Sequence, residues 1–317
     1  MKLLLPDHLI EHLREFVCQI APNCEIVPIG PDGEITESPE GADVIFLRWG
    51  LNPETTRRLL TRIPNLRWVH TISAGVDHLL FPELRDSEVI LTNASGVFNV
   101  PIAETVMAYI LAVVKRLPEF WARQREHRWE KLPLRELHGL TVGIIGLGDI
   151  GTEVARLCRA FGMRVLGLRR RLAPSDVADE VLPPDRLHDL LARSDFVVIA
   201  VPLTAQTRGM IGRAELAAMK PDAWLINISR GAIVDEEALI EALRAGHIGG
   251  ACLDVFAEEP LPAESPLWDM PNVIITPHNS WSSPHIEERE IDLFLENLRR
   301  YVAGEPLLNV VDKQAGY

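Results

Sequence analysis

Residues 141–151 read TVGIIGLGDIG, and this stretch decides the fold. It opens as an apolar run suited to a buried strand, and its glycines match the pattern G-x-G-x-x-G. In that pattern Gly146 allows a tight turn, Gly148 lets the backbone approach a pyrophosphate, and Gly151 lets a helix pack closely on the strand. A second apolar run follows at 164–168. This order of strand, glycine turn, helix and strand predicts a Rossmann unit that binds a dinucleotide.

Two residues of the turn, Asp149 and Ile150, stand before its last glycine. The helix that begins here offers N–H groups and the positive end of its dipole to phosphate groups. We therefore expect both residues to lie against the cofactor and to bind it through the backbone. The carboxylate of Asp149 fits near a pyrophosphate if its side chain points to solvent. The alternative interpretation is a plain glycine-rich turn.

The end of the second strand selects the cofactor. An NAD site places an Asp or Glu there, about 20 residues after the glycines, to bind the ribose 2′-hydroxyl. This sequence has Arg169, Arg170 and Arg171 instead. Guanidinium groups suit a 2′-phosphate, so the run predicts a preference for NADP(H), with NAD(H) still possible. The alternative is a solvated basic turn.

Outward from this stretch, short apolar runs alternate with helical segments in both directions, which is typical of a parallel α/β sheet. On the C-terminal side the pattern predicts a doubly wound unit of six strands, at 141–146, 164–168, 195–201, 223–228, 249–253 and 272–276. On the N-terminal side it predicts strands at 2–5, 43–47, 67–71 and 89–92.

The expected helices complete this alternation. They lie at about 150–161, 185–193, 213–219 and 235–245, with a long apolar helix at 100–116 and an amphipathic one at 285–303. We expect two doubly wound parallel-sheet α/β domains. A Rossmann cofactor domain at 98–280 is inserted in a flavodoxin-like substrate domain made of 1–97 and 281–317. The active site is expected in the cleft between them.

Charge and composition exclude several classes of protein. The net charge of −13 argues against a surface that holds nucleic acid or an anionic membrane. The chain has no apolar run long enough for a membrane span, and Pro6 interrupts the N-terminal run too early for a signal peptide. The cysteines show no zinc-like spacing, and free thiols are favoured over disulfides. These features predict a cytoplasmic protein.

The long helix at 100–116 is apolar on nearly all sides, which indicates burial, for example at a subunit interface. Trp121 and Trp129 follow it and are candidates for packing at such an interface. The sequence therefore suggests a homodimer.

Three motifs each follow an expected sheet strand: INISRG at 226–231, LDVFAEEP at 253–260 and TPHN at 276–279. Ligands of open α/β sheets bind at the carboxyl ends of the strands. With SAGVDHL at 73–79 and VPLT at 201–204, these motifs make the chain resemble the D-isomer-specific 2-hydroxyacid dehydrogenase family over nearly its whole length.

By this resemblance, Arg230, Glu259 and His278 occupy the catalytic positions. A 2-keto acid carries a carboxylate beside a carbonyl. Arg230 can bind the carboxylate and polarise the carbonyl. His278 is a suitable proton donor, because imidazole ordinarily titrates at about pH 6.5. Glu259 would orient that imidazole and favour its charged form. The resemblance predicts hydride transfer from NADPH to a small 2-keto acid, such as glyoxylate or hydroxypyruvate, and needs no metal.

The resemblance also implies further contacts with the cofactor. Asp254 is expected to accept a hydrogen bond from the nicotinamide carboxamide, while Pro202, Thr207 and Ile228 line the cofactor. Trp281 also stands among the expected cofactor residues. It departs from the family pattern, in which a small Gly or Ala often follows the catalytic histidine, and this bulk bears on the loop shape and the substrate size.

The substrate is expected to meet residues of both domains. Ser73, Ala74 and Gly75 follow a predicted strand, and in the family this loop donates backbone N–H groups to the substrate carboxylate. Trp49, at the end of another strand, is a candidate for shaping the side-chain pocket, with a core tryptophan as the alternative. Arg230 and His278 complete the expected substrate contacts.

Two other functions stay open at this point. One is an NAD-dependent dehydrogenase of another D-2-hydroxy acid, such as a phosphorylated one; such chains often carry a regulatory domain, for which this sequence is expected to leave no room. The other is a dinucleotide-sensing protein on the same scaffold. The catalytic set argues against a sensor, because a sensor needs no proton donor.

Overall fold

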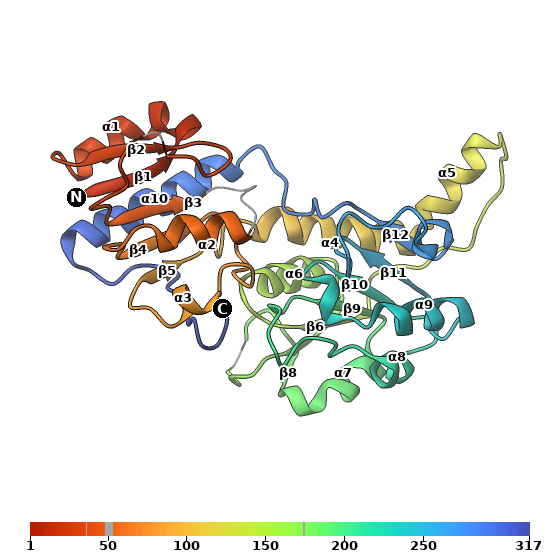
Figure 1. Ribbon diagram of the computed structural model, residues 1–317. Coiled ribbons are helices and arrows are strands. Elements are labelled where there is room, and N and C mark those ends of the chain that lie inside the picture. Colours follow the sequence, from red (N-terminus) through yellow and green to blue (C-terminus); the bar gives the residue numbers. More distant parts are fainter. Residues whose placement is uncertain (36, 48–52, 174) are drawn as a thin grey trace. The chain divides into compact units, whose positions relative to one another are not determined.

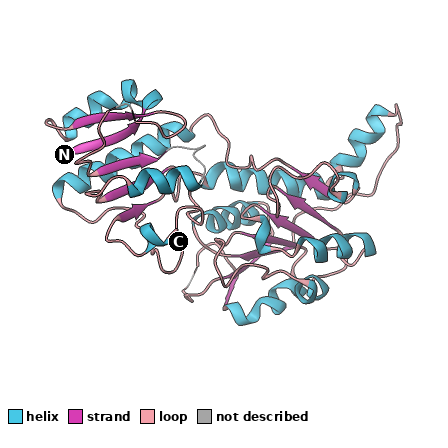
Figure 2. Ribbon diagram, viewed as in Figure 1, coloured by secondary structure: helices cyan, strands magenta, loops and turns pink. Residues whose placement is uncertain are grey.

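The structure is a computed structural model that describes residues 1–35, 37–47, 53–173 and 175–317. The predicted substrate residue Trp49 lies outside these residues. The chain divides into two compact units, unit 1 (Met1–Phe98 with Ser283–Tyr317) and unit 2 (Asn99–Ser282). Each unit is a sheet of parallel strands with helices packed on it (Figures 1 and 2). The predicted fold class, one α/β domain inserted in another, is confirmed.

Unit 2 contains a parallel sheet whose described strands run in the order β12-β11-β10-β9-β6-β7-β8. They are β6 (Thr141–Ile145), β7 (Arg164–Leu168), β8 (Glu180–Leu182), β9 (Phe196–Ile199), β10 (Trp224–Asn227), β11 (Gly250–Leu253) and β12 (Val273–Ile275). The prediction of six strands was wrong, because β8 was missed. This edge strand has three residues and starts with Glu180, so it carries no apolar period.

The helices of unit 2 are α4 (Asn99–Val114), α5 (Leu117–Arg125), α6 (Asp149–Ala160), α7 (Leu187–Arg193), α8 (Arg213–Ala218) and α9 (Glu236–Ala245), with short 3₁₀ turns η2 (Pro184–Arg186), η3 (Gly231–Ile233) and η4 (Pro266–Asp269). The expected helix at 100–116 ends early. The backbone of Arg116 is left-handed, with φ of 51°, and α5 begins at Leu117 with Pro118 in its first turn.

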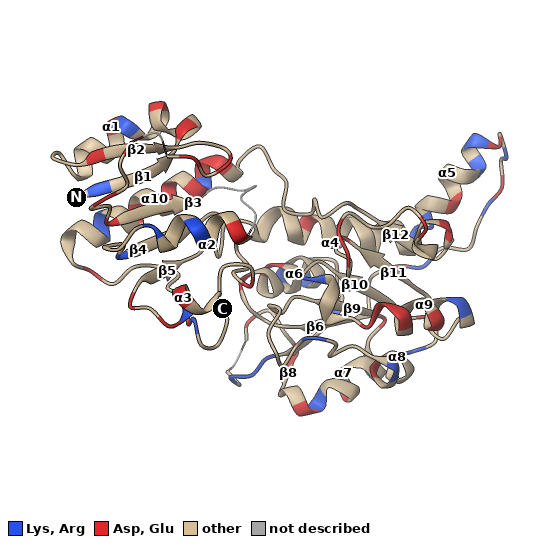
Figure 3. Cartoon of the chain, viewed as in Figure 1, with Lys and Arg blue, Asp and Glu red and all other residues tan. Residues whose placement is uncertain are grey.

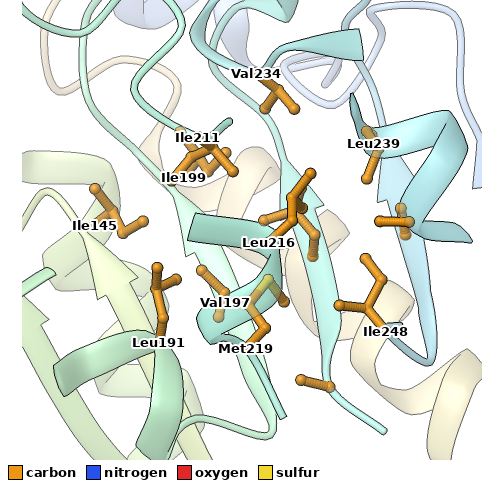
Figure 4. Close-up of a cluster of buried hydrophobic side chains, with 14 of the residues drawn as sticks. Ile145, Leu191, Val197, Ile199, Ile211, Leu216, Met219, Val234, Leu239 and Ile248 are labelled. Atoms are coloured by element: carbon orange, nitrogen blue, oxygen red, sulfur yellow. The ribbon is translucent and has the colours of Figure 1, made fainter. Parts of the chain in front are cut away.

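The core of unit 2 is built on alternate residues of its strands. Val197 and Ile199 of β9 point into an apolar cluster with Leu191 of α7, Leu216 of α8 and Leu239 of α9 (Figure 4). Helix α6 packs against α4, where the Sγ atom of the buried Cys158 lies 3.7 Å from the Sδ atom of Met107. Near the centre of the sheet, the parallel strands β6 and β9 pair, so that their carboxyl ends lie side by side.

Unit 1 contains a parallel sheet with described strands in the order β2-β1-β3-β4-β5, the flavodoxin-like order. They are β1 (Lys2–Pro6), β2 (Glu25–Ile29), β3 (Val44–Leu47), β4 (Trp68–Thr71) and β5 (Ile90–Thr92). Strand β2 was not predicted, because Pro28 interrupts its sequence. It lies at the edge of the sheet, where a missing backbone N–H is tolerated.

The C-terminal segment completes the core of unit 1. The helices of this unit are α1 (Ile10–Ile20), α2 (Pro53–Thr61), α3 (Pro82–Arg85) and α10 (Ile286–Ala303), with the 3₁₀ turn η1 (Asp7–Leu9). Phe294 and Leu298 of α10 are fully buried against Leu3 and Leu5 of β1. The ring of Phe294 stacks on that of Phe46 with centroids 4.4 Å apart. The amphipathic helix therefore returns to the first domain.

His70 of β4 is a buried polar residue within this apolar core. Its Nδ1 atom lies 2.8 Å from the Oγ1 atom of Thr92, which also accepts a hydrogen bond from Nε1 of Trp68. Its Nε2 atom has no hydrogen-bond partner among the described residues. Burial lowers the pKa of His70 to about 3, so the side chain is neutral at physiological pH.

The described residues form neither a membrane-spanning helix nor a cluster of metal-binding side chains. No helix in the described ranges combines the length and apolar character that crossing a bilayer requires. Across the same residues, no three His, Cys, Asp or Glu side chains gather in a way that could hold a metal ion.

Candidate active site

The glycines that follow β6 are fixed by packing at two positions and open at the third. Gly146 has φ of 105°, and a Cβ there would lie 2.5 Å from the carbonyl oxygen of Ala200. A Cβ on Gly151 would lie 1.9 Å from the carbonyl oxygen of Gly146. At Gly148 no described atom lies within 4 Å of the Cβ position. The loop therefore leaves a backbone cradle at Gly148, which fits a pyrophosphate.

Helix α6 begins at this cradle. Gly148 is its N-cap residue, so no side chain caps the first turn of α6 within the described structure. Asp149 and Ile150 form the start of the helix, and Ile150 is half-buried while Asp149 is exposed. The N–H groups of a first helical turn are the donors that phosphate groups use in such folds.

The arginine run lies where β7 ends. The backbone N–H of Arg169 donates to the carbonyl oxygen of Leu182 at 3.1 Å, which places Arg169 at the carboxyl end of the strand. Arg169 is half-buried, whereas Arg170 and Arg171 are exposed. Figure 3 shows this run as a blue stretch of the loop that leads to β8. Three cations therefore stand at the position where the ribose end of a dinucleotide is expected.

The loop after β9 closes on itself. The hydroxyl of Thr207 donates to the carbonyl oxygen of Pro202 at 2.6 Å and accepts from the backbone N–H of Thr204 at 2.8 Å. The Oγ atom of Ser229, at the end of β10, donates to the carbonyl oxygen of Ile199 at 3.0 Å. These bonds fix the loops after β9 and β10 beside the glycine turn.

The turn that carries Arg230 is built by a buried asparagine. Asn227 is 1% exposed; its Oδ1 atom accepts from the N–H of Ser229 at 3.1 Å, and its Nδ2 atom donates to the carbonyl oxygen of Arg230 at 3.0 Å. Ile228 points into the interior. The Nη1 atom of Arg230 donates to the carbonyl oxygen of Ser229 at 2.9 Å. The guanidinium is therefore held at the end of β10.

Gly231 brings this turn against the segment after β11. A Cβ at Gly231 would lie 1.9 Å from the carbonyl carbon of Phe256 and 2.4 Å from the backbone nitrogen of Ala257. Any larger residue would push the two segments apart. The glycine of the SRG motif thus sets the distance between Arg230 and the segment that carries Glu259.

One carboxylate oxygen of Glu259 contacts His278, and the other accepts a hydrogen bond from the backbone N–H of Phe256. The Oε2 atom lies 2.7 Å from Nδ1 of His278, and the Oε1 atom accepts from the N–H of Phe256 at 3.0 Å. An ionised carboxylate offers only acceptors, so the proton of this bond belongs to Nδ1. The Nε2 atom of this half-exposed imidazole takes no part in the contact with Glu259.

The charge of Glu259 is stabilised where it stands. Burial raises the pKa of its carboxyl group, but this effect is outweighed by the hydrogen bonds from His278 and Phe256 and by the charges of His278 and Arg230. The pKa of Glu259 is lowered as a result. Arg230 therefore lies near enough to Glu259 for its charge to act on this carboxylate, which in turn contacts His278.

Asp254 organises the loop after β12. This residue has no exposed surface, and its side chain accepts hydrogen bonds from Oγ1 of Thr276 and from the N–H groups of Asn279 and Ser280. Its predicted contact with the nicotinamide carboxamide stays a prediction. On the other side of the loop, Nε1 of Trp281 donates to the carbonyl oxygen of His278 at 2.9 Å.

The predicted substrate loop belongs to unit 1. Ser73 is buried, while Ala74 and Gly75 are half-buried. The Nδ2 atom of Asn93 donates to the carbonyl oxygen of Ala74 at 2.7 Å. The backbone N–H groups of Ala74 and Gly75 donate to no acceptor within the described ranges. A carboxylate is a suitable acceptor for such a pair.

Comparison with known proteins fits this arrangement. A family model described as the NAD binding domain of D-isomer specific 2-hydroxyacid dehydrogenases matches residues 107–280, and these contain the glycine turn and all three candidate catalytic residues. The chain is 39% identical over 272 residues to the glyoxylate/hydroxypyruvate reductase B of Pectobacterium carotovorum, a match that covers 84% of this chain and 85% of that protein.

The chain belongs to the D-isomer specific 2-hydroxyacid dehydrogenase family. As a member, it is an NAD(P)-dependent oxidoreductase of 2-hydroxy acids and the corresponding 2-keto acids. A solved structure of a D-isomer specific 2-hydroxyacid dehydrogenase from Xanthobacter autotrophicus, in complex with NADPH and MES, has a TM-score of 0.88 at 34% identity and covers 100% of this chain and 99% of that one.

Two further relatives frame the substrate question. The NADPH-dependent glyoxylate/hydroxypyruvate reductase of Sinorhizobium meliloti, solved with NADP and sulfate, has a TM-score of 0.86 at 32% identity over 100% of this chain and 99% of that one. The D-3-phosphoglycerate dehydrogenase of Methanocaldococcus jannaschii is 33% identical over 98% of this chain. The chain spans 59% of the length of that relative.

Structure adds residues to this 2-hydroxyacid dehydrogenase site that sequence reasoning did not assign. Asn227 shapes the Arg230 turn, Gly231 sets its spacing, and Tyr109 and Thr276 contact each other beside Asp254. Asn227 and Gly231 belong to the INISRG motif, and a polar residue at the end of a buried strand is a sequence signal that could have identified Asn227. The sequence carries no such signal for Tyr109, because this residue lies in an apolar helix far along the chain from the loop that it contacts.

Proposed function

We propose that this dehydrogenase reduces a small 2-keto acid to a D-2-hydroxy acid with NADPH. The observation that carries the proposal is the contact of 2.7 Å between Glu259 and Nδ1 of His278. It leaves Nε2 of His278 as the proton donor and keeps a negative charge behind the ring. Arg230 completes a set suited to a substrate with a carboxylate beside a carbonyl.

The roles of the protein side chains follow from this geometry. When bound, the reduced nicotinamide supplies the hydride for the carbonyl carbon. Arg230 binds the carboxylate and the carbonyl oxygen, which draws electron density away from that carbon. His278 donates the proton on Nε2 to the oxygen as negative charge develops there. Glu259 orients the ring and stabilises the imidazolium before transfer; in the oxidation direction, neutral His278 is the base.

The preference for NADPH rests on Arg169, Arg170 and Arg171 at the end of β7. Three guanidinium groups and no carboxylate there favour a 2′-phosphate over a free hydroxyl. Two similar structures were solved with NADPH or NADP bound, which supports the same choice. Gly146, Gly148, Asp149, Ile150 and Gly151 hold the pyrophosphate in this proposal, and Pro202, Thr207, Ile228, Asp254 and Trp281 line the rest of the cofactor.

Glyoxylate and hydroxypyruvate are the proposed substrates. Within the loop of Ser73, Ala74 and Gly75, the last two residues supply backbone N–H groups for the carboxylate, since the N–H of Ser73 donates to Oγ1 of Thr71 at 3.3 Å. Relatives with glyoxylate reductase or glyoxylate/hydroxypyruvate reductase names support this substrate class. The similarity to a D-3-phosphoglycerate dehydrogenase favours a second candidate, the oxidation of a phosphorylated D-2-hydroxy acid with NAD.

Steady-state kinetics with both nucleotides on a panel of 2-keto acids separates these candidates. We expect kcat/KM for glyoxylate or hydroxypyruvate to be at least about tenfold higher with NADPH than with NADH. Equal or better use of NADH would defeat the cofactor assignment. Turnover of a phosphorylated hydroxy acid with NAD, and of no keto acid with NADPH, would favour the second candidate.

Assembly and location complete the proposal. Helix α5 buries none of its residues, Trp121 is 53% exposed and Trp129 is 98% exposed. Large exposed indoles favour a partner surface, and we propose a homodimer that covers them. Free thiols at all four cysteines suit the reducing cytoplasm. Light scattering should give twice the chain mass, falling to one chain mass in Trp121→Glu; a monomeric wild type would contradict the dimer.

A further inference from the structure

A directed pair of hydroxyl hydrogen bonds connects helix α4 to Asp254. The hydroxyl of Tyr109 contacts Oγ1 of Thr276, and Oγ1 of Thr276 donates to Oδ1 of Asp254 at 2.5 Å. A threonine hydroxyl has one hydrogen to donate. Since that hydrogen goes to Asp254, Tyr109 is the donor to Thr276. The direction of both bonds is therefore fixed, from α4 toward the carboxylate.

Tyr109 is suited to this role because it stays protonated. The residue is 4% exposed, and burial raises the pKa of its phenol. A second residue of the same helix reaches the same loop, since Oγ1 of Thr105 lies 3.4 Å from the carbonyl oxygen of Ser280. The closer acceptor of the Thr105 hydroxyl is the carbonyl oxygen of Pro101 at 3.0 Å, so helix α4 holds the loop of residues 276–280 at Thr276 and lies close to it at Ser280.

That loop needs to be held, because His278 has an unfavourable backbone conformation. Its φ is 49°, in the left-handed region, which is unfavourable for a residue with a Cβ. The N–H of His278 donates to the carbonyl oxygen of Asp254 at 2.7 Å, and the N–H of Asn279 donates to its side chain at 2.9 Å. A conformation of this kind persists only where surrounding contacts determine it.

We propose that Tyr109 and Thr276 are positioning residues for His278, acting through Asp254. They touch neither the imidazole nor the substrate in this scheme, and they rest on the function proposed above. The carboxylate of Asp254 fixes the conformation of the loop of residues 276–280, and the hydroxyls of Tyr109 and Thr276 fix the orientation of that carboxylate. Among the described residues, Glu259 is the charged group in contact with His278, and removing either hydroxyl leaves Glu259 untouched.

Deleting each hydroxyl tests the proposal. We expect Tyr109→Phe to lower kcat for keto-acid reduction about fivefold and Thr276→Val about 50-fold, since a small misplacement of a catalytic group is costly. KM for the keto acid and for NADPH should stay within about twofold, because Arg230 and the glycine turn are untouched. Thr276→Ser keeps the hydroxyl and should restore kcat to within about threefold of the wild type.

Tyr301→Phe is the matched control, because it removes a phenol hydroxyl from unit 1, where Tyr301 packs on Trp68. We expect its kcat to equal that of the wild type. Full kcat in both Tyr109→Phe and Thr276→Val, with thermal unfolding unchanged, would overturn the proposal. So would a failure of Thr276→Ser to restore activity while it restores the unfolding temperature.

Hydrogen exchange provides a readout that needs no turnover. The amide hydrogens of Thr276 and of residues 278–282 should exchange at least about fivefold faster in Tyr109→Phe and Thr276→Val than in the wild type or Tyr301→Phe. If the wild type reduces no keto acid but this exchange responds, the proposed function fails and the positioning role stands. If the wild type is active and neither kcat nor exchange responds, the positioning role fails alone.

Discussion

Gly231 lies so close to Phe256 that a Cβ on the glycine would come within 1.9 Å of the carbonyl carbon of the phenylalanine. The turn that carries Arg230 and the segment that carries Glu259 are therefore in backbone contact. Two of the three proposed catalytic groups depend on this one approach for their spacing.

Replacing Gly231 with Ala should damage activity more than stability. We expect a loss of about 1–3 kcal/mol in the free energy of unfolding, as for other overpacked sites, and a drop in kcat of about 100-fold from the displaced Arg230. Urea unfolding and steady-state kinetics measure the two effects. Gly30→Ala is the control, because its Cβ would meet its nearest neighbour, the carbonyl oxygen of Glu34, at 3.5 Å. Normal kcat in Gly231→Ala would contradict the role of this contact.

Removing the imidazole should remove most of the chemistry. We expect His278→Ala to lower kcat by about 10²–10⁴-fold, the usual contribution of a general acid, with NADPH binding unchanged. Fluorescence titration with NADPH checks the binding and stopped-flow reduction checks the rate. A variant that retains full turnover of every accepted keto acid would show that the proton comes from elsewhere.

The acid side of the pH profile reports on Glu259. Its pKa is lowered in the folded protein, so the carboxylate keeps its charge, and its contact with His278, as the pH falls through the ordinary titration range of glutamate. We expect kcat/KM for reduction by the wild type to show no loss from protonation of Glu259 down to about pH 5, because the carboxylate still holds its charge there. In Glu259→Gln, kcat/KM should fall about tenfold or more at neutral pH, where the charge behind the ring is missing. Glu258→Gln, one exposed position away, should match the wild type.

The arginine run should govern nucleotide choice. In the double variant Arg169→Ala/Arg170→Ala, we expect KM for NADPH to rise about tenfold or more while KM for NADH changes less than about twofold. Arg156→Ala is the control, because this exposed arginine of α6 pairs with Glu153 on its own helix. An equal loss with both nucleotides would indicate damage to the fold at the end of β7.

Acid should weaken unit 1 through His70. The pKa of this residue is lowered to about 3 by burial, while an unfolded histidine titrates at 6.5, so its neutral form stabilises the folded state above pH 6.5 and that stability is lost as the pH falls. Between pH 8 and pH 5 the linkage amounts to about 2 kcal/mol. Urea unfolding at both pH values measures it. His70→Asn should have a lower free energy of unfolding than the wild type at pH 8, but this free energy should fall less between pH 8 and pH 5. The same pH dependence in both proteins would contradict the assignment to His70.

Much of the fold could be predicted because its signals are local. The glycine turn at 146–151 and the apolar strands on either side of it follow from packing rules that act over a few residues. Strands β2 and β8 could not be predicted, because an edge strand is paired on one side alone and tolerates residues such as Pro28 and Glu180. Their existence is decided by a neighbouring strand, which a local pattern does not contain.

The candidate site divides in the same way. The residues at strand ends, such as Arg230 and His278, could be proposed from the sequence because their motifs resemble those of the 2-hydroxyacid dehydrogenase family. The supporting residues were not, because Tyr109 reads as one more apolar position of α4. It acquires its role only from Thr276, which is 167 positions away in sequence.

The return of α10 to unit 1 also has a consequence for synthesis of the chain. A ribosome completes every strand of unit 2 before it reaches Phe294 and Leu298, which fill the core between β1, β3 and β4. Unit 2 can therefore fold during translation, while the apolar face of the unit 1 sheet stays exposed until α10 has been synthesised. The domain begun first is the one finished last, and it is the domain more exposed to chaperones and proteases in the interval.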